Sequence, residues 1–144
     1  MPTDIQVVFD CHHPDRQAAF WAAALGYVLE PPPPGFATWD EFLDSIGVPA
    51  DERDASAVVD PEGKRPRIFF QRVPEDKVAK NRMHLDLAAS GGRGVPLEQR
   101  RMLVDAEVAR LKALGASDER GAREEGGGYW VRLNDPEGNE FCVH

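Results

Sequence analysis

The sequence has few cysteines, a deficit of basic residues and no long apolar run. Its 144 residues include two cysteines, Cys11 and Cys142, too few for a disulfide scaffold and without Cys-x-x-Cys spacing. No apolar run approaches the ~20 residues that a membrane span needs, and the amino terminus lacks a signal-peptide pattern. With 17 basic against 25 acidic residues, the net charge of −8 disfavours binding to nucleic acid or to an anionic membrane. We therefore expect a cytoplasmic protein with reduced cysteines and with neither of these partners.

What the sequence does contain is an internal repeat. Residues 82–88 alternate between apolar side chains and the polar His84 and Asp86, which is the period of a strand with two different faces. Residues 4–10 alternate in the same way and place Gln6 where the later copy has His84. We therefore predict that the two segments form equivalent strands. The apolar positions that the repeat matches are Ile5 with Met83, Val7 with Leu85, and Phe9 with Leu87.

Two further motifs recur in the same order. Asp-Pro-Glu-Gly stands at 60–63 and again at 135–138, each time between two β-prone stretches. Proline presets φ and glycine supplies a positive φ, so this motif predicts a hairpin turn. Ala-Leu-Gly stands at 24–26 and at 113–115, each at the end of a helix-like segment where glycine suits the left-handed cap. Each half is thus predicted to run strand, helix, then two or three strands.

The first half carries an insert. From Gly26 to Asp60 is 34 positions, whereas from Gly115 to Asp135 is 20, so the first half is 14 residues longer. We assign the excess to residues 31–50, which begin with four prolines that favour an extended stem.

The insert is also expected to contain a short helix with an aromatic face. Thr38 is a suitable N-cap for a helix over 38–43, which includes Trp39 and Phe42. These two aromatic side chains either roof a ligand cavity or pack the helix down onto the rest of the domain.

The chain resembles the vicinal oxygen chelate superfamily. The resemblance rests on the paired modules, on the His-Leu-Asp-Leu strand at 84–87 and on the Asp-Pro-Glu-Gly-Asn turn at 135–139. Segments 20–26, 69–75 and 80–87 are similar to its glyoxalase-like domain branch. The superfamily also includes glyoxalase I, the bleomycin- and fosfomycin-resistance proteins and the extradiol dioxygenases.

This resemblance implies an α+β fold. A single glyoxalase-like domain over 1–144 would consist of two βαβββ modules whose strands form a curved mixed sheet around a cavity. Module one would span about 1–74, with its insert at 31–50, and module two about 80–144. Because relatives commonly pair their modules across a dimer, we expect a homodimer.

The resemblance also implies where a metal would bind. The ligand positions on the first strands fall on Gln6 and His84, and the position on the last strand of module one falls near Gln71. The last acidic ligand position falls on Cys142, while Glu140, two residues earlier, faces the same way and could supply a carboxylate. Amide, imidazole and thiol groups suit Zn²⁺ or Ni²⁺ better than Mg²⁺ or Mn²⁺, so we expect either one of the former ions or no tightly bound metal.

Several of these residues have a second interpretation. His84 and Asp86 are candidate catalytic residues, with Asp86 either orienting the imidazole or accepting a proton. The alternative for each is a polar strand residue that only satisfies a hydrogen bond. Cys142 is either a pocket residue, a nucleophile or a small buried strand residue. Trp130 is expected in the core. The predicted ligand pocket comprises Trp39, Phe42, Gln71 and Cys142.

The function expected from these features is binding of a small organic molecule in the sheet cavity. An enzyme would be a lyase or isomerase, or act in a dioxygenase-like way, and would need a metal or an acid–base pair near His84. A sequestering protein of the bleomycin-resistance type would need only an aromatic pocket and a dimer. A regulatory domain with a filled cavity is a third hypothesis.

Overall fold

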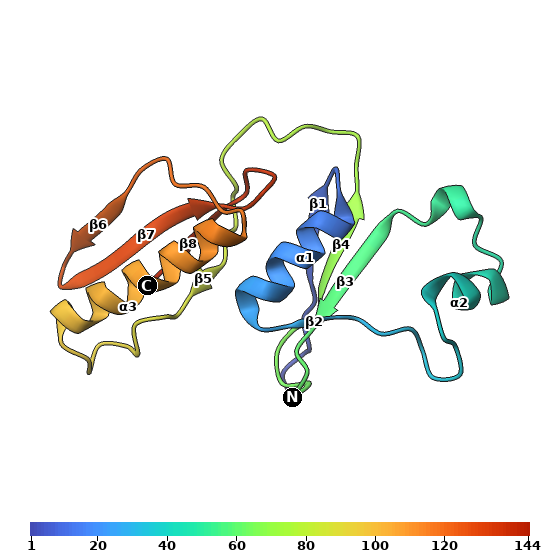
Figure 1. Ribbon diagram of the computed structural model, residues 1–144, viewed down its shortest axis with the longest axis horizontal. Helices are drawn as coiled ribbons and strands as arrows, with labels where there is room; N and C mark the ends of the chain where they lie inside the picture. Colours follow the sequence, from blue (N-terminus) through green and yellow to red (C-terminus); the bar gives the residue numbers. More distant parts are fainter. The chain divides into compact units, whose positions relative to one another are not determined.

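The computed structural model describes residues 1–144, and the chain divides into two compact units, Met1–Pro74 and Glu75–His144 (Figure 1). Unit 1 contains β1 (Val7–Cys11), α1 (Pro14–Leu25), β2 (Val28–Leu29), α2 (Trp39–Ser45), the 3₁₀ helix η1 (Ala50–Glu52), β3 (Ala55–Val59) and β4 (Ile68–Arg72). Unit 2 contains β5 (Asp86–Leu87), α3 (Leu97–Leu114), β6 (Ala122–Glu125), β7 (Gly128–Asn134) and β8 (Glu140–Val143). That the two units make up one domain stays a prediction.

Each unit holds one mixed sheet, and the two sheets have the same topology. The strand order is β1-β4-β3-β2 in unit 1 and β5-β8-β7-β6 in unit 2. In each sheet the first strand pairs in parallel with the last, and the other pairs are antiparallel. The prediction of an α+β fold made of two βαβββ modules is therefore confirmed.

The repeated first strands are equivalent but shorter than predicted. β1 begins at Val7, and β5 consists of Asp86 and Leu87 alone. Ile5 and Met83, expected on the apolar face, precede these strands and are 70% and 87% exposed. Alternation indicates which face a residue takes, but a strand extends only as far as its partner offers backbone hydrogen bonds.

Both Asp-Pro-Glu-Gly motifs form the predicted hairpin turns. They connect β3 to β4 and β7 to β8, and Gly63 and Gly138 adopt positive φ angles of 66° and 86°. The aspartate at the start of each turn accepts backbone hydrogen bonds, and Asp60 does so from the N–H groups of Glu62 and Lys64. The aspartate side chain therefore stabilises its own turn through these hydrogen bonds.

Replacing Asp60 by asparagine is expected to reduce the sensitivity of the fold to acid. The N–H of Glu62 does most to lower the pKa of Asp60, and Arg65 and the N–H of Lys64 add to this against the opposing effect of burial. A carboxyl with a lowered folded-state pKa stabilises the protein above its unfolded value of 3.8 and loses this contribution as the pH falls below it.

Urea unfolding from neutral pH to below the unfolded pKa measures this effect. The matched control is Glu62→Gln, which removes an exposed carboxylate from the same turn. Equal acid sensitivity in Asp60→Asn and the unmodified protein would rule out this role for Asp60.

One long helix covers one face of each sheet. α1 packs on β3 and β4 through Phe20, Trp21 and Ala24, and it ends at Gly26 in the left-handed conformation. α3 packs on β7 with its buried side chains, which are Val104, Val108 and Leu111. No helix in the structure combines the length and the apolar character that crossing a membrane demands. In unit 2 no helix covers the face of the sheet opposite α3, whereas in unit 1 α2 lies on the other side of β3 from α1 (Figure 1).

Candidate functional site

The open face of the unit 2 sheet carries polar side chains because of the alternation along β8. Phe141 and Val143 are buried on the α3 side, so Cys142 between them faces the opposite side. β5 pairs in parallel with β8 and sets Asp86 directly beside Cys142. The first and last strands of unit 2, β5 and β8, thus place a carboxylate and a thiol next to each other.

His84 joins this pair and completes a cluster of three possible ligands. Its Nε2 lies 3.2 Å from Oδ1 of Asp86. One donor atom from each of His84, Asp86 and Cys142 lies within 4.8 Å of the others. Ligand atoms around a tetrahedral zinc ion lie about 3.3 to 3.8 Å apart, given metal–ligand distances of about 2.0 to 2.3 Å. Small side-chain movements would be enough to bring the three donors within reach of one ion.

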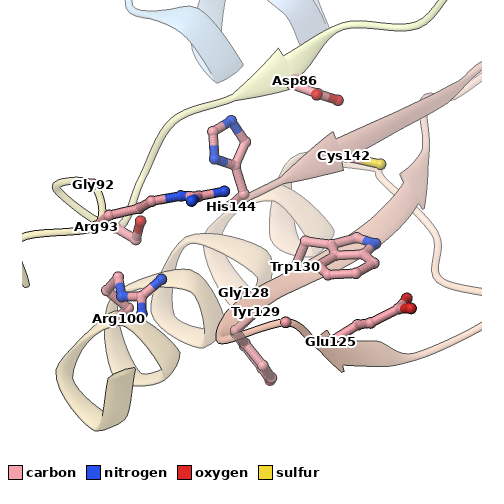
Figure 2. A pocket seen from close by; sticks show the side chains of 12 residues that line it. Asp86, Gly92, Arg93, Arg100, Glu125, Gly128, Tyr129, Trp130, Cys142 and His144 are labelled. Carbon is pink, nitrogen blue, oxygen red and sulfur yellow. The ribbon is translucent and has the colours of Figure 1, made fainter. Parts of the chain in front are cut away.

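A cavity of about 360 Å³ opens beside this cluster. Asp86 and Cys142 lie in its wall, and Figure 2 shows His144, at the end of β8, between them and the arginines. Trp130 of β7 also lines the cavity and is only partly buried, so the expectation that it belongs to the core is wrong. It faces away from α3 because Tyr129 and Val131, its neighbours on β7, take the helix side.

Two arginines supply positive charge to this cavity. Arg100 of α3 donates from Nε to the carbonyl of Val95 and from a terminal nitrogen to the carbonyl of Gly127, both at 2.9 Å. Arg93 lines the same cavity and makes no ion pair in the structure. Its guanidinium is therefore available to an anionic group of a ligand.

The Cys142 thiol is not activated as a nucleophile by its surroundings. Burial raises its pKa above the usual range, and the nearby Asp86 carboxylate raises it further. A thiol with a raised pKa is mostly protonated at neutral pH and reacts slowly. A metal ion displaces that proton, so this environment suits a metal ligand better than a free nucleophile.

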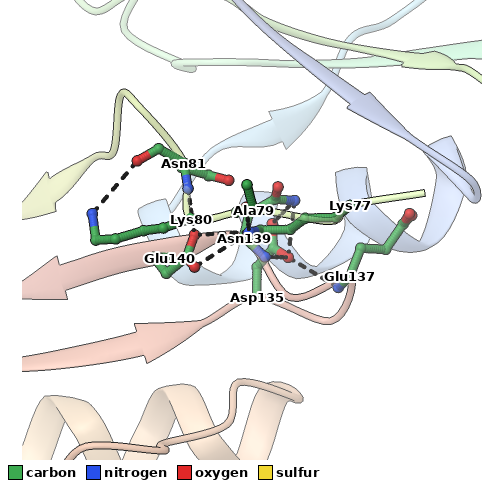
Figure 3. A network of polar contacts seen from close by, with 8 residues as sticks. All are labelled: Lys77, Ala79, Lys80, Asn81, Asp135, Glu137, Asn139 and Glu140. Atoms are coloured by element: carbon green, nitrogen blue, oxygen red, sulfur yellow. Dashed lines mark hydrogen bonds and ion pairs between the residues drawn. The ribbon is translucent and has the colours of Figure 1, made fainter. Parts of the chain in front are cut away.

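Glu140, which was predicted as a metal ligand, is engaged in a separate network (Figure 3). Its carboxylate accepts a hydrogen bond of 3.0 Å from the N–H of Asn81 and forms an ion pair of 3.1 Å with Lys77. Burial acts to raise the pKa of Glu140. The hydrogen bonds from the backbone N–H groups of Asn81 and Glu140 and the contact with Lys77 outweigh the effect of burial, so the pKa is lowered. The structure does not bring Glu140 into the cluster of His84, Asp86 and Cys142.

The two glutamines predicted near a metal lie in unit 1 and have partners there. Gln6 accepts a hydrogen bond of 2.9 Å from Arg67. Gln71 donates one of 2.7 Å to Asp10, its cross-strand neighbour in the β1–β4 pair. Their participation in a metal site stays a prediction.

The insert residues also lie in unit 1. Thr38 caps α2 by accepting a hydrogen bond from the N–H of Glu41, as predicted. Trp39 lines a second cavity, whereas Phe42 packs edge-on against Phe36 and Trp39, with ring centroids at 5.3 and 5.9 Å. Of the two predicted aromatic residues, one contacts the cavity and the other supports it.

Sequence reasoning missed Asp10, His144 and Arg93. Period-two alternation could have indicated the first two, because Asp10 shares a strand face with Gln6, although Val8 between them is apolar, and His144 continues the face of Glu140 and Cys142. Arg93 lies in the loop before α3, where no periodic signal exists.

The comparisons with known proteins agree on the fold. A family model described as a glyoxalase-like domain matches residues 6–144. A glyoxalase/bleomycin resistance protein/dioxygenase family enzyme from Burkholderia phytofirmans PsJN is 17% identical, with a TM-score of 0.64 over 98% of this chain and 97% of that one. No curated protein sequence matches this chain.

Two further solved structures are similar. A mutant of the fosfomycin resistance protein FosX from Listeria monocytogenes, in complex with Mn(II) and 1S,2S-dihydroxypropylphosphonic acid, is 14% identical, with a TM-score of 0.59 over 100% of this chain and 90% of that one. Lactoylglutathione lyase from Agrobacterium tumefaciens is 17% identical, with a TM-score of 0.55 over 99% of this chain and 93% of that one. Identities this low show the fold alone. With the family match over residues 6–144, the chain belongs to the glyoxalase-like domain family of the vicinal oxygen chelate superfamily.

Proposed function

We propose that the protein binds a small organic molecule on the open face of the unit 2 sheet, beside a divalent metal held by His84, Asp86 and Cys142. The observation that carries this proposal is the convergence of these three donors, of which Asp86 and Cys142 lie in the wall of the 360 Å³ cavity. A cavity of that volume falls within the range of about 300 to 1,000 Å³ that is typical of small-molecule sites.

The chemistry of the donors fits zinc. Imidazole, carboxylate and thiolate are all zinc ligands, and three protein ligands leave the fourth position for water or a ligand atom, as in catalytic zinc sites. Mg²⁺ and Mn²⁺ favour oxygen donors, and only Asp86 of the three supplies one. When bound, such an ion acts as a Lewis acid that polarises an oxygen of the ligand. The Mn(II) in the related FosX structure supports a divalent ion in this fold.

The other cavity residues favour a ligand that carries a negative group. The free guanidinium of Arg93 can form a bidentate contact with a carboxylate or phosphonate. The indole of Trp130 offers an apolar surface on the opposite part of the wall. The phosphonate bound in the related FosX structure supports an acid of this kind.

A lyase or isomerase activity is the second candidate, and the contact between His84 and Asp86 favours it. An imidazole held at 3.2 Å by a carboxylate is a suitable general base when it is not bound to a metal. Incubating the protein with a bound ligand, once loaded with metal and once free of it, distinguishes the two candidates. A ligand recovered unchanged indicates sequestration, and a converted ligand indicates an enzyme.

Replacing His84 by alanine is expected to abolish stoichiometric zinc binding. The full-length protein, dialysed against zinc and then against metal-free buffer, should retain about one ion per chain, and His84→Ala should retain almost none because two donors remain. Atomic absorption gives the ratio. The matched control is His13→Ala, which removes an exposed imidazole from unit 1. Zinc retained equally by His84→Ala would eliminate the proposed site.

A further inference from the structure

The insert over residues 31–50, which we call the flap, encloses a cavity of about 620 Å³ against the sheet of unit 1. Trp39 and Leu43 of α2 line the flap side, and Phe69 of β4 lies in the wall on the sheet side. Figure 1 shows α2 on the other side of β3 from α1, so the cavity is separate from the core under α1. The flap cavity is large enough for a small organic molecule.

Specific contacts hold the flap in place. Arg53, just before β3, is 14% exposed and forms ion pairs with Asp40 and Asp44 of α2. Its Nε also donates to the carbonyl of Val48 at 3.2 Å. One guanidinium thus fixes both the helix and the end of the flap, and a wall fixed in advance lowers the entropic cost of binding a ligand.

A further hydrogen bond fixes the aromatic wall. The indole Nε1 of Trp39 donates to the carbonyl of Glu30 at 2.8 Å, which ties α2 to the segment after β2. Phe42 packs edge-on against the same indole. Trp39 is nevertheless 37% exposed, so part of its ring remains available to a ligand.

The charges around the flap cavity are mainly negative. Five carboxylates line it against two guanidiniums, an excess of three negative charges; these are Asp15, Glu30, Asp40, Glu52 and Asp54 against Arg53 and Arg67. Both guanidiniums are already neutralised, Arg53 by the flap aspartates and Arg67 by Glu30. Asp15 and Glu52 make no ion pair in the structure. An entering anion would find no available positive group, whereas a cation would find two available carboxylates.

The residues that line the cavity favour an organic cation over a metal ion. The three-donor group that could hold a metal lies in unit 2, and unit 1 contains none. The aromatic faces of Trp39 and Phe69 attract a cation through their π electrons, and Phe69 already has the Arg67 guanidinium 5.2 Å from its ring centroid. Leu29, Leu43 and Val48 add aliphatic surface to the wall.

We propose that the flap cavity is a second binding site, which takes a small organic cation with an aromatic or branched aliphatic body. Trp39 provides the π contact and Asp15 and Glu52 provide the negative charge. The site uses residues other than those of the metal cluster, so its existence does not depend on the function proposed for unit 2.

Calorimetric titration of the full-length protein with three probes of similar size tests this proposal. Benzyltrimethylammonium is expected to bind at least about tenfold more tightly than benzyl alcohol or phenylacetate. Equal affinity for the cation and the neutral alcohol, or a preference for the anion, would overturn the proposal.

Substitutions then locate the site. The double variant Asp15→Asn, Glu52→Gln keeps the side-chain shapes and should weaken cation binding roughly tenfold, with zinc loading unchanged. Trp39→Ala should weaken it roughly fivefold. The matched control is Asp51→Asn, which removes the adjacent carboxylate of η1 that does not line the cavity. Cation binding that survives the double variant, or that Asp51→Asn reduces equally, contradicts the assignment.

Discussion

Replacing Cys142 by serine is expected to lower the affinity for zinc by at least about 100-fold and to change the order of metal preference. Loss of a residue that merely orients a metal ligand already lowers affinity about 10- to 100-fold, so loss of a ligand should have a larger effect. Serine is almost the same size but offers a neutral hydroxyl in place of a thiolate. Hard ions such as Mn²⁺ gain relative to Zn²⁺ when sulfur is replaced by oxygen.

Competition with a chromophoric chelator measures both affinities in the same protein. The matched control is Cys11→Ser, because Cys11 is the other cysteine, lies in unit 1 and is buried at 3% exposure. It should leave both metal affinities unchanged. If zinc binds Cys142→Ser as tightly as the unmodified protein, sulfur is not a ligand and Glu140 or Gln71 must be considered again.

Replacing Trp21 by alanine is expected to lower the free energy of unfolding of unit 1 by about 3 to 5 kcal/mol, as for other buried aromatic residues. Trp21 is fully buried at 0% exposure and contacts Phe9 and Phe20, with ring centroids at 5.4 and 5.2 Å. Truncation removes apolar burial and leaves a cavity between α1 and the sheet. A loss of this size is a large part of the stability of an ordinary domain.

Urea unfolding followed by circular dichroism checks this prediction. The matched control is Trp39→Ala, the same truncation at a partly exposed flap residue, which should cost far less because no core cavity forms. A similar loss for both variants would contradict the larger contribution to stability that we assign to the buried Trp21.

The sequence predicts much of the fold because the fold depends on local patterns. The repeated Asp-Pro-Glu-Gly turns and the glycine caps act within a few residues, and the structure contains both hairpins and both helix ends. The length of β5 could not be predicted, because its limits depend on hydrogen bonds with β8, more than 50 residues later in the chain.

The candidate site was less predictable because it depends on cross-strand register. Alternation indicates that His84 and Asp86 share a face, and the parallel β5–β8 register then adds Cys142. Glu140 faces the same side, but its carboxylate contacts Lys77 and Asn81, in a connector whose path has no sequence signature. The partners of Gln6 and Gln71 also depend on a parallel strand pair that joins distant segments.

X-ray absorption at the zinc edge tests the central claim most directly, because it identifies the ligand atoms whether or not the protein is an enzyme. We expect one sulfur at about 2.3 Å and two or three nitrogen or oxygen atoms at about 2.0 to 2.1 Å in the zinc-loaded protein, with an imidazole signal that His84→Ala removes. A first shell of nitrogen and oxygen alone, or a zinc ion that is lost on dialysis from the unmodified protein, would contradict a site formed by His84, Asp86 and Cys142.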